Sequence, residues 1–357
     1  MNDQPLSERE QTVLDAVIRT YVETAEPAGS RTVAKRHALK VSPATIRNAM
    51  ADLEEKGYLF HPHTSAGRVP TDRAYRYFVD TLMRPLRPTA AEQRRLRREL
   101  SGEDSGALER LIARATRVLG LLTGELGLAI APNLDEVVLE RIELVLITSE
   151  KVLLVLRLTR GVVRTVYVDV AVAVPSGTLA AVTMILNERL AGHSLADIRA
   201  TLPDRLRDAG SDASSTELLN ILMESAGDAL GPGSRAGEEI VLGYTSVVAS
   251  QPEFAEHERL RGLIELTEQR GLLRSVLRQR EHDATPMITI GAEHGDPRLT
   301  PFTLVTSEYE MGGLSGVLGV MGPTRMPYAK VAALVEYTSV LVGQLGTETD
   351  RTTMDDG

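Results

Sequence analysis

The chain has 357 residues, of which 43% are hydrophobic and 25% charged, with four Phe and no Trp. This composition excludes a disordered chain and predicts about two folded domains with largely aliphatic cores. The absence of cysteine excludes disulfides, thiolate metal ligands and cysteine nucleophiles. The net charge of −9 is unevenly distributed, because residues 28–76 sum to +5 and the remainder to −14. A basic segment on an acidic body is typical of a DNA-binding module attached to a sensing or partner-facing body.

The N-terminal sequence MNDQPLSERE lacks the basic start and apolar run of a signal peptide. No apolar stretch approaches the roughly 18 residues that a membrane span needs. We therefore expect a cytoplasmic protein that does not contact a membrane.

Two helices are predicted before residue 40. Ser7 and Glu10 have the spacing of a capping box and precede a run with one apolar face. Ser30 is placed to cap a second, short helix that ends near His37. The exposed basic residues of this second helix are predicted to meet DNA phosphates: Arg31, Lys35 and Arg36.

A third helix begins at Ser42, a favoured capping residue, followed by Pro43 at the first helical position. Its inward face is apolar at helical spacing. Small residues on the outward face permit close approach to DNA, while Arg suits guanine, Asn suits adenine, and Thr suits a thymine methyl or a phosphate. The predicted DNA-reading residues are Ser42, Ala44, Thr45, Arg47 and Asn48. The alternative is an amphipathic surface helix whose polar residues are merely solvated.

The segment GYLFHPHTSAGRVP then predicts a strand, a polar tip and a returning strand, which is the wing of a winged helix-turn-helix. Ser65, Gly67 and Arg68 are predicted to contact the DNA backbone or minor groove. His61 and His63 suggest a metal as an alternative, but further ligands at useful spacing are lacking, so loop histidines are favoured.

Two segments of the sequence carry a family resemblance. The runs EPAGSRTVAKRHALKVSPATIRNAMADLEEKGYL and HPHTSAGRVPTDRAYRYFVD closely resemble the bacterial heat-inducible transcription repressor HrcA family. Near the C-terminus, ITIGAEHG and GGLSGVLGVMGPTRMPYAKVAALVEYTS resemble the second signature of that family. One departure is Ala74, where the family pattern has Gly, and this concerns the backbone after the wing.

The resemblance implies a homodimeric repressor of chaperone operons that binds double-stranded DNA at an inverted repeat called CIRCE. It also implies a GroE-type chaperonin as the partner that promotes the active repressor. For the fold, it implies a GAF-like domain that carries an inserted dimerising domain.

The remaining chain predicts an α+β body. Thr89 and Glu92 again have capping-box spacing, residues 136–170 alternate like antiparallel strands, and further strands are predicted near 287–291, 303–309 and 314–321. Two strand-rich blocks separated by mixed sequence suggest one domain with an insertion. The expected organisation is a winged helix-turn-helix at 1–80, a linker helix at 81–105, a GAF-like domain at 106–175 and 271–345, an inserted dimerising domain at 176–270, and a disordered tail at 346–357.

No catalytic, metal-binding or cofactor-binding residues are predicted. The glycine-rich run GGLSGVLG lacks the Lys-Ser/Thr of a phosphate loop and is interpreted as a turn with close strand packing. An enzyme is therefore disfavoured. The alternative function is a ligand-gated regulator whose GAF-like domain binds a small molecule and shifts the population of a DNA-competent dimer.

Overall fold

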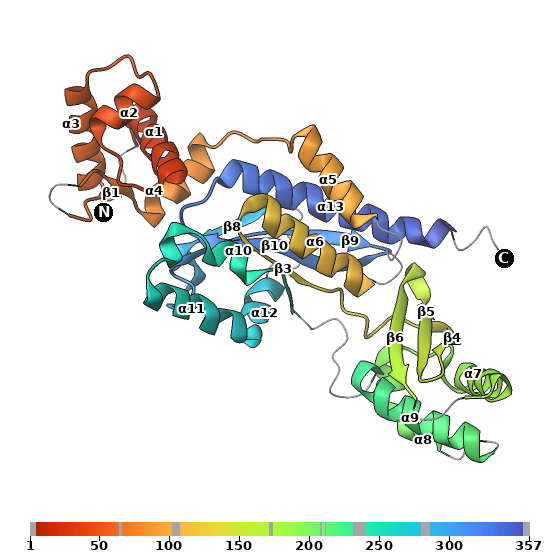
Figure 1. Ribbon diagram of the computed structural model, residues 1–357. Helices are drawn as coiled ribbons and strands as arrows, with labels where there is room; N and C mark the ends of the chain where they lie inside the picture. The colour runs from red at the N-terminus through yellow and green to blue at the C-terminus, as the bar shows by residue number, and fades with distance from the viewer. Residues whose placement is uncertain are drawn as a thin grey trace.

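The computed structural model describes residues 5–63, 66–101, 108–170, 174–207, 209–210, 212–230, 240–279 and 286–352. Three units follow one another in space, with the N-terminal helices at one end, a five-stranded sheet in the middle and a smaller sheet with three helices at the other end (Figure 1). Within the described part of the chain, none of the helices combines the length and apolarity needed to cross a membrane.

The N-terminal unit contains three helices, a two-stranded hairpin and a short fourth helix. These elements are α1 (Glu8–Thr24), α2 (Ser30–Arg36), α3 (Pro43–Glu55), β1 (Leu59–Phe60), β2 (Val69–Pro70) and α4 (Asp72–Tyr77), with a final π turn at Phe78–Leu82. The predicted capping box of Ser7 and Glu10 is confirmed. The prediction that Ser30 caps α2 was wrong, because Gly29 holds the N-cap position and makes no side-chain cap bond.

The central unit is an antiparallel sheet in the order β7-β3-β10-β9-β8. Its strands are β3 (Leu126–Ile130), β7 (Ile240–Leu242), β8 (Met287–Ile290), β9 (Phe302–Met311) and β10 (Leu314–Pro323). Gly312 and Gly313 join β9 to β10 in a tight turn with φ of 58° and 75°, so these glycines form the predicted turn. This is the unit to which the resemblance assigns a GAF-like fold.

Helices cover both faces of the central sheet (Figure 1). One face carries α5 (Ala90–Leu100), α6 (Leu108–Thr123) and α13 (Tyr328–Thr352), and the other carries α10 (Thr245–Ala249), α11 (His257–Glu268) and α12 (Arg270–Arg278). Gly127 lets α6 lie directly on β3, because a Cβ there would stand 1.9 Å from the Thr116 carbonyl oxygen. The capping box of Thr89 and Glu92 on α5 is confirmed.

The third unit is an insertion between the neighbouring strands β3 and β7. It contains the sheet β4-β5-β6 and three helices: β4 (Leu139–Thr148), β5 (Lys151–Leu158), β6 (Val163–Asp169), α7 (Ser176–Leu190), α8 (Leu195–Leu206) and α9 (Ala213–Leu230). Short 3-10 turns occur at Thr159–Gly161 here, and at Pro252–Phe254 and Gly291–His294 in the central unit.

The expected domain boundaries differ from the sheet topology at two places. The strands predicted at 136–170 form their own sheet with α7–α9, so the change of unit falls between β3 and β4 rather than at residue 176. The chain rejoins the central sheet at β7, well before residue 270, because β7 pairs with β3 and α10–α12 pack beneath that sheet. Helix α13 also continues to Thr352, past the expected start of the tail at 346, and residues 353–357 lie outside the described residues.

Candidate nucleic-acid interface

Helix α3 is fixed at its start and packed along one side. The Ser42 Oγ accepts the N–H of Thr45 at 3.1 Å and lies 2.9 Å from the Thr45 Oγ1, with Pro43 at the first helical position as predicted. The inward face is buried, as predicted, at Ile46, Ala49, Met50 and Leu53. Ser42 therefore uses its hydroxyl as a cap and sets where the helix begins.

Four of the five predicted reading residues are exposed: Ser42 at the N-cap, and Ala44, Arg47 and Asn48 on the outward face of α3. Thr45 is half-buried, and its hydroxyl is occupied by Ser42. The surface available for base edges is thus narrower than the sequence suggested.

Exposed cations lie on α2, on α3 and in the turn between them, and we call them the basic face: Arg31, Lys35, Arg36, Lys40 and Arg47. Arg36 pairs with Glu23 at 3.2 Å, but both side chains are about half exposed, so water competes with this pair. In the described part of the chain, Arg31, Lys35 and Arg47 make no ion pair. Lys40, in the turn between α2 and α3, was not among the predicted contacts, although its charge within a short turn was a readable signal.

The hairpin residues have mainly structural roles. The Arg68 Nη2 lies 2.7 Å from Glu54 Oε2, and only 14% of the Arg68 side chain is exposed. A Cβ on Gly67 would stand 2.5 Å from the Ala28 carbonyl, where Ala28 and Arg68 bridge the hairpin to the segment before α2. Arg68 therefore faces α3, and the predicted backbone or minor-groove contact of Gly67 and Arg68 stays a prediction. Ser65 lies outside the described residues.

His61 shares this carboxylate, with its Nδ1 2.6 Å from Glu54 Oε1. Among the described residues, no group of three or more His, Asp or Glu side chains is placed to hold a metal ion. Glu54 thus joins the hairpin to α3 through two contacts and fixes the angle between them.

A second ion pair joins the end of α3 to the start of α1. The Lys56 Nζ lies 2.6 Å from Glu10 Oε1. Burial alone would raise the pKa of Glu10, but the hydrogen bonds from Lys56 and Ser7 outweigh it and lower this pKa. Ala74, the departure from the family pattern, is fully buried in α4, and its N–H is accepted by the Thr71 hydroxyl, so a methyl side chain fits this backbone.

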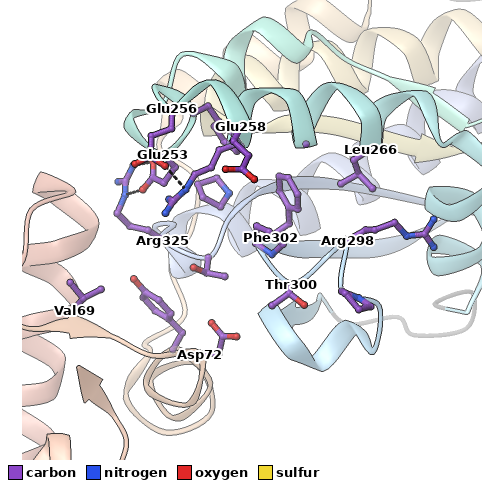
Figure 2. A pocket seen from close by; sticks show the side chains of 18 of the residues that line it. Val69, Asp72, Glu253, Glu256, Glu258, Leu266, Arg298, Thr300, Phe302 and Arg325 are labelled. Atoms are coloured by element: carbon purple, nitrogen blue, oxygen red, sulfur yellow. Dashed lines mark hydrogen bonds and ion pairs between the residues drawn. The ribbon is translucent and has the colours of Figure 1, made fainter. Parts of the chain in front are cut away.

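A cleft of about 920 Å³ separates the N-terminal unit from the central unit (Figure 2). Its walls come from the hairpin and α4 on one side, and from α11 and the loops flanking β9 and β10 on the other. Figure 2 shows Asp72 and Glu258 on opposite walls, with Phe302 between them and Arg325 at one end. This size and position at a unit boundary are those of small-molecule pockets.

Comparison with known proteins identifies the family. The model of the HrcA protein C-terminal domain matches residues 109–332. The chain belongs to the HrcA family. Proteins named heat-inducible transcription repressor HrcA match over nearly the whole length: that of Chlorobium phaeovibrioides is 35% identical over 94% of this chain and 96% of its own. That of Geobacter sulfurreducens is 36% identical over 95% and 98%.

A solved structure shares the fold. A crystal structure described as a hypothetical protein superposes with a TM-score of 0.72 and 21% identity, covering 97% of this chain and 100% of that one. At this sequence identity, the structural similarity supports the fold of this HrcA chain but gives no information about its function.

Proposed function

We propose that this HrcA chain is a heat-inducible transcription repressor that binds a double-stranded inverted-repeat operator of the CIRCE type as a homodimer. The observation that carries the proposal is the outward face of α3, where Ala44, Arg47 and Asn48 are exposed beside the cations of α2. Arg and Asn are the side chains that read guanine and adenine edges in the major groove, and nearby cations neutralise phosphates. The HrcA relatives are transcription repressors, and we assign no catalytic activity to this chain.

The homodimer is proposed from the inserted unit. Its β4 is an edge strand, and large apolar side chains are exposed on this sheet: Val145, Leu146, Ile147 and Tyr167. An exposed apolar strand edge favours pairing with an identical surface, which gives a two-fold dimer. Two-fold symmetry in the protein then matches the two-fold symmetry of an inverted repeat.

The first test is fluorescence anisotropy with a labelled inverted repeat and a scrambled duplex at one fixed salt concentration. Preferential binding to the repeat supports the proposal. Equal binding to both duplexes, with and without a GroE-type chaperonin, contradicts it. Stronger binding with the chaperonin supports the further proposal, drawn from the family resemblance, that this partner promotes the active repressor in the cytoplasm.

Base reading is tested by two single changes on the same surface. Asn48→Ala and Arg47→Ala are each expected to cost about 1 to 3 kcal/mol of operator binding and to relax specificity, because a bidentate base contact is lost. Lys35→Ala serves as the matched control, since a phosphate contact weakens binding to both duplexes alike. Equal losses on operator and scrambled DNA for Asn48→Ala would exclude its base-reading role.

The second candidate function is a ligand-gated regulator, and the cleft between the units favours it. A small molecule held there would touch both units and bias their arrangement. A saturable thermal shift with one metabolite class that also changes operator affinity would support this candidate. Thermal shifts without any effect on operator affinity would argue against it.

A further inference from the structure

Arg325, in the loop between β10 and α13, connects the central unit to the N-terminal unit. Its Nη1 donates to the Val22 carbonyl in the last turn of α1 at 2.7 Å. The other side of the guanidinium binds Glu253 twice, through Nε to Oε1 and through Nη2 to Oε2 at 2.9 Å. Figure 2 shows this pair at the end of the cleft that faces α1.

The end of α1 is suited to this contact. The last carbonyls of a helix lack intrahelical donors and carry a partial negative charge, which basic side chains stabilise. The last turn of α1 contains no basic residue of its own. Arg325 supplies the missing charge from a position about 300 residues later in the sequence. Because only 13% of the Arg325 side chain and 16% of the Glu253 side chain are exposed, water competes poorly for this contact.

Arg76, on α4 of the N-terminal unit, makes a second connection, which reaches into the central unit. Its Nε and Nη2 lie 2.7 Å and 2.6 Å from the two carboxylate oxygens of Glu293, and Nη2 also donates to the Ile288 carbonyl at 2.6 Å. Glu293 is held in turn by the N–H of Ile290 at 2.8 Å. A planar guanidinium bound at two edges fixes direction as well as distance.

Further contacts also join the two units, and one of them is a hydrogen bond in which the Ala292 N–H donates to Asp72 Oδ2 at 3.1 Å. Tyr75 and Phe78 contact the Tyr328 ring at centroid distances of 5.6 Å and 6.5 Å, and the cleft separates the walls beyond them. Aromatic pairs accept both offset-stacked and edge-to-face arrangements, whereas a bidentate arginine contact fixes one direction. Among these contacts the two arginine–carboxylate pairs are bidentate, so they constrain the angle between the units most strongly.

We infer that Arg76 and Arg325 are positioning residues that fix the N-terminal unit against the central unit and so determine which operator spacing the dimer accepts. The DNA part of this inference rests on the proposed function. The two α3 helices of a dimer must reach half-sites separated by whole turns of the duplex. The angle at this boundary sets the reach of each α3, so loosening it relaxes the spacing requirement.

The boundary itself is tested without DNA. The chain lacks cysteine, so Glu55→Cys and Glu268→Cys, both at exposed positions on opposite sides of the boundary, introduce two spin labels cleanly. Labelled protein is mixed with excess unlabelled protein so that distances within one chain dominate. The variant removes both pairs as neutral amides, R76Q/E293Q/R325Q/E253Q, so that no unpaired charge is left buried.

The matched control is R259Q/E256Q, which removes an exposed 3.3 Å pair on the wall of the same cleft without touching the connection between units. The expected result is a label-distance distribution at least about twofold broader in the fourfold variant and unchanged in the control. Indistinguishable distributions in the fourfold variant and the wild type would overturn the inference. Because label distances need no operator, this result stands even if the proposed function fails.

The consequence for DNA is tested with three duplexes: the inverted repeat, the same repeat with its spacer changed by half a helical turn, and a single half-site. The fourfold variant is expected to bind the half-site within about twofold of the wild type and to lose at least about fivefold of the preference for the original spacer. An unchanged spacer preference would overturn the inference, as would an equal loss on the half-site. If the wild type itself shows no preference for the inverted repeat, the proposed function fails, and the label distances alone decide the positioning role.

Discussion

Arginines occupy two contrasting environments in this chain. On the basic face, Arg31 and Arg47 are exposed and, within the described residues, make no ion pair. At the boundary between the units, Arg76 and Arg325 each bind a carboxylate through two nitrogens and also donate to a backbone carbonyl. The comparison shows that the surroundings decide the role of an arginine: satisfied guanidinium groups hold units together, whereas unsatisfied ones remain available for phosphates and bases.

The largest effect on the free energy of unfolding is expected from breaking the buried arginine–carboxylate pair at the boundary. Arg325→Ala leaves the Glu253 carboxylate buried without its partner, which is expected to lower the free energy of unfolding by about 3 to 5 kcal/mol. Urea denaturation followed by circular dichroism measures this change. Glu253→Ala added to Arg325→Ala should recover part of the loss, and a double variant less stable than the single one would contradict the explanation.

The next effect concerns Glu125, a buried carboxyl beside the same boundary. Its Oε2 accepts from the Gln251 Nε2 at 2.8 Å, and burial raises the pKa of Glu125 to about 8. The unfolded chain releases this proton from about pH 4.5 upward while the folded chain retains it to about pH 8, so the free energy of unfolding falls as the pH rises through that interval.

Glu125→Gln replaces the ionisable carboxyl group with a neutral amide, so the dependence of stability on pH that comes from this group is lost. The variant is expected to be more stable than the wild type at about pH 8, by at most about 4 kcal/mol, and to lose this advantage near pH 4.5. Thermal or urea unfolding at several pH values measures the difference. A stability difference that is constant across this range would show that ionisation of Glu125 is not its cause.

A smaller effect, on operator binding, is expected from removing an exposed cation of the basic face. Lys35→Ala should weaken operator binding several-fold and flatten the dependence of log Kd on log salt concentration by about one unit, without changing stability. Arg68→Ala should lower the free energy of unfolding and leave the salt dependence of binding unchanged. The reason is that Arg68 is bound to Glu54, so its loss affects the hairpin. Titrations at several salt concentrations separate the two variants, and a flattened slope for Arg68→Ala would support its predicted DNA contact instead of a purely structural role.

The smallest effect is expected at Arg259, which lines the cleft but pairs with Glu256 in the open. Their side chains are 60% and 73% exposed. Arg259→Ala should change the free energy of unfolding by less than about 1 kcal/mol, since exposed pairs are screened by water. A loss comparable with that of Arg325→Ala would show that exposure does not separate the two kinds of arginine.

Local features of the fold were predictable because they depend on neighbours in the sequence. The caps at Ser7, Ser42 and Thr89 each involve a partner three residues away, and all three are present. The cap at Ser30 failed because Gly29, one residue earlier, adopts the extended conformation that an N-cap needs. Periodicity likewise located the buried side of α3.

Features that depend on distant partners were not predictable. Alternating apolar residues predicted the strands of 139–169, but alternation does not specify which strands pair, so their separate sheet was missed. Arg68 looked available in the sequence because nothing there shows that the hairpin folds it back onto Glu54. The connection from Arg325 to Val22 joins residues about 300 positions apart, and a single sequence contains no signal for it.

The insertion also has a consequence for the order of folding. Ile130 of β3 is paired with Ile240 of β7, so the chain leaves and re-enters the central sheet at one point. Closing a flexible loop of this length costs roughly 3 kcal/mol more than closing a four-residue turn. If the inserted unit folds first, it brings its two ends together and shortens the loop that remains. The β3–β7 edge then closes at little further cost, whereas β10, which pairs with β3 on its other side, lies still later in the chain. A newly made chain therefore forms the unit that we propose to dimerise before it can complete its central sheet.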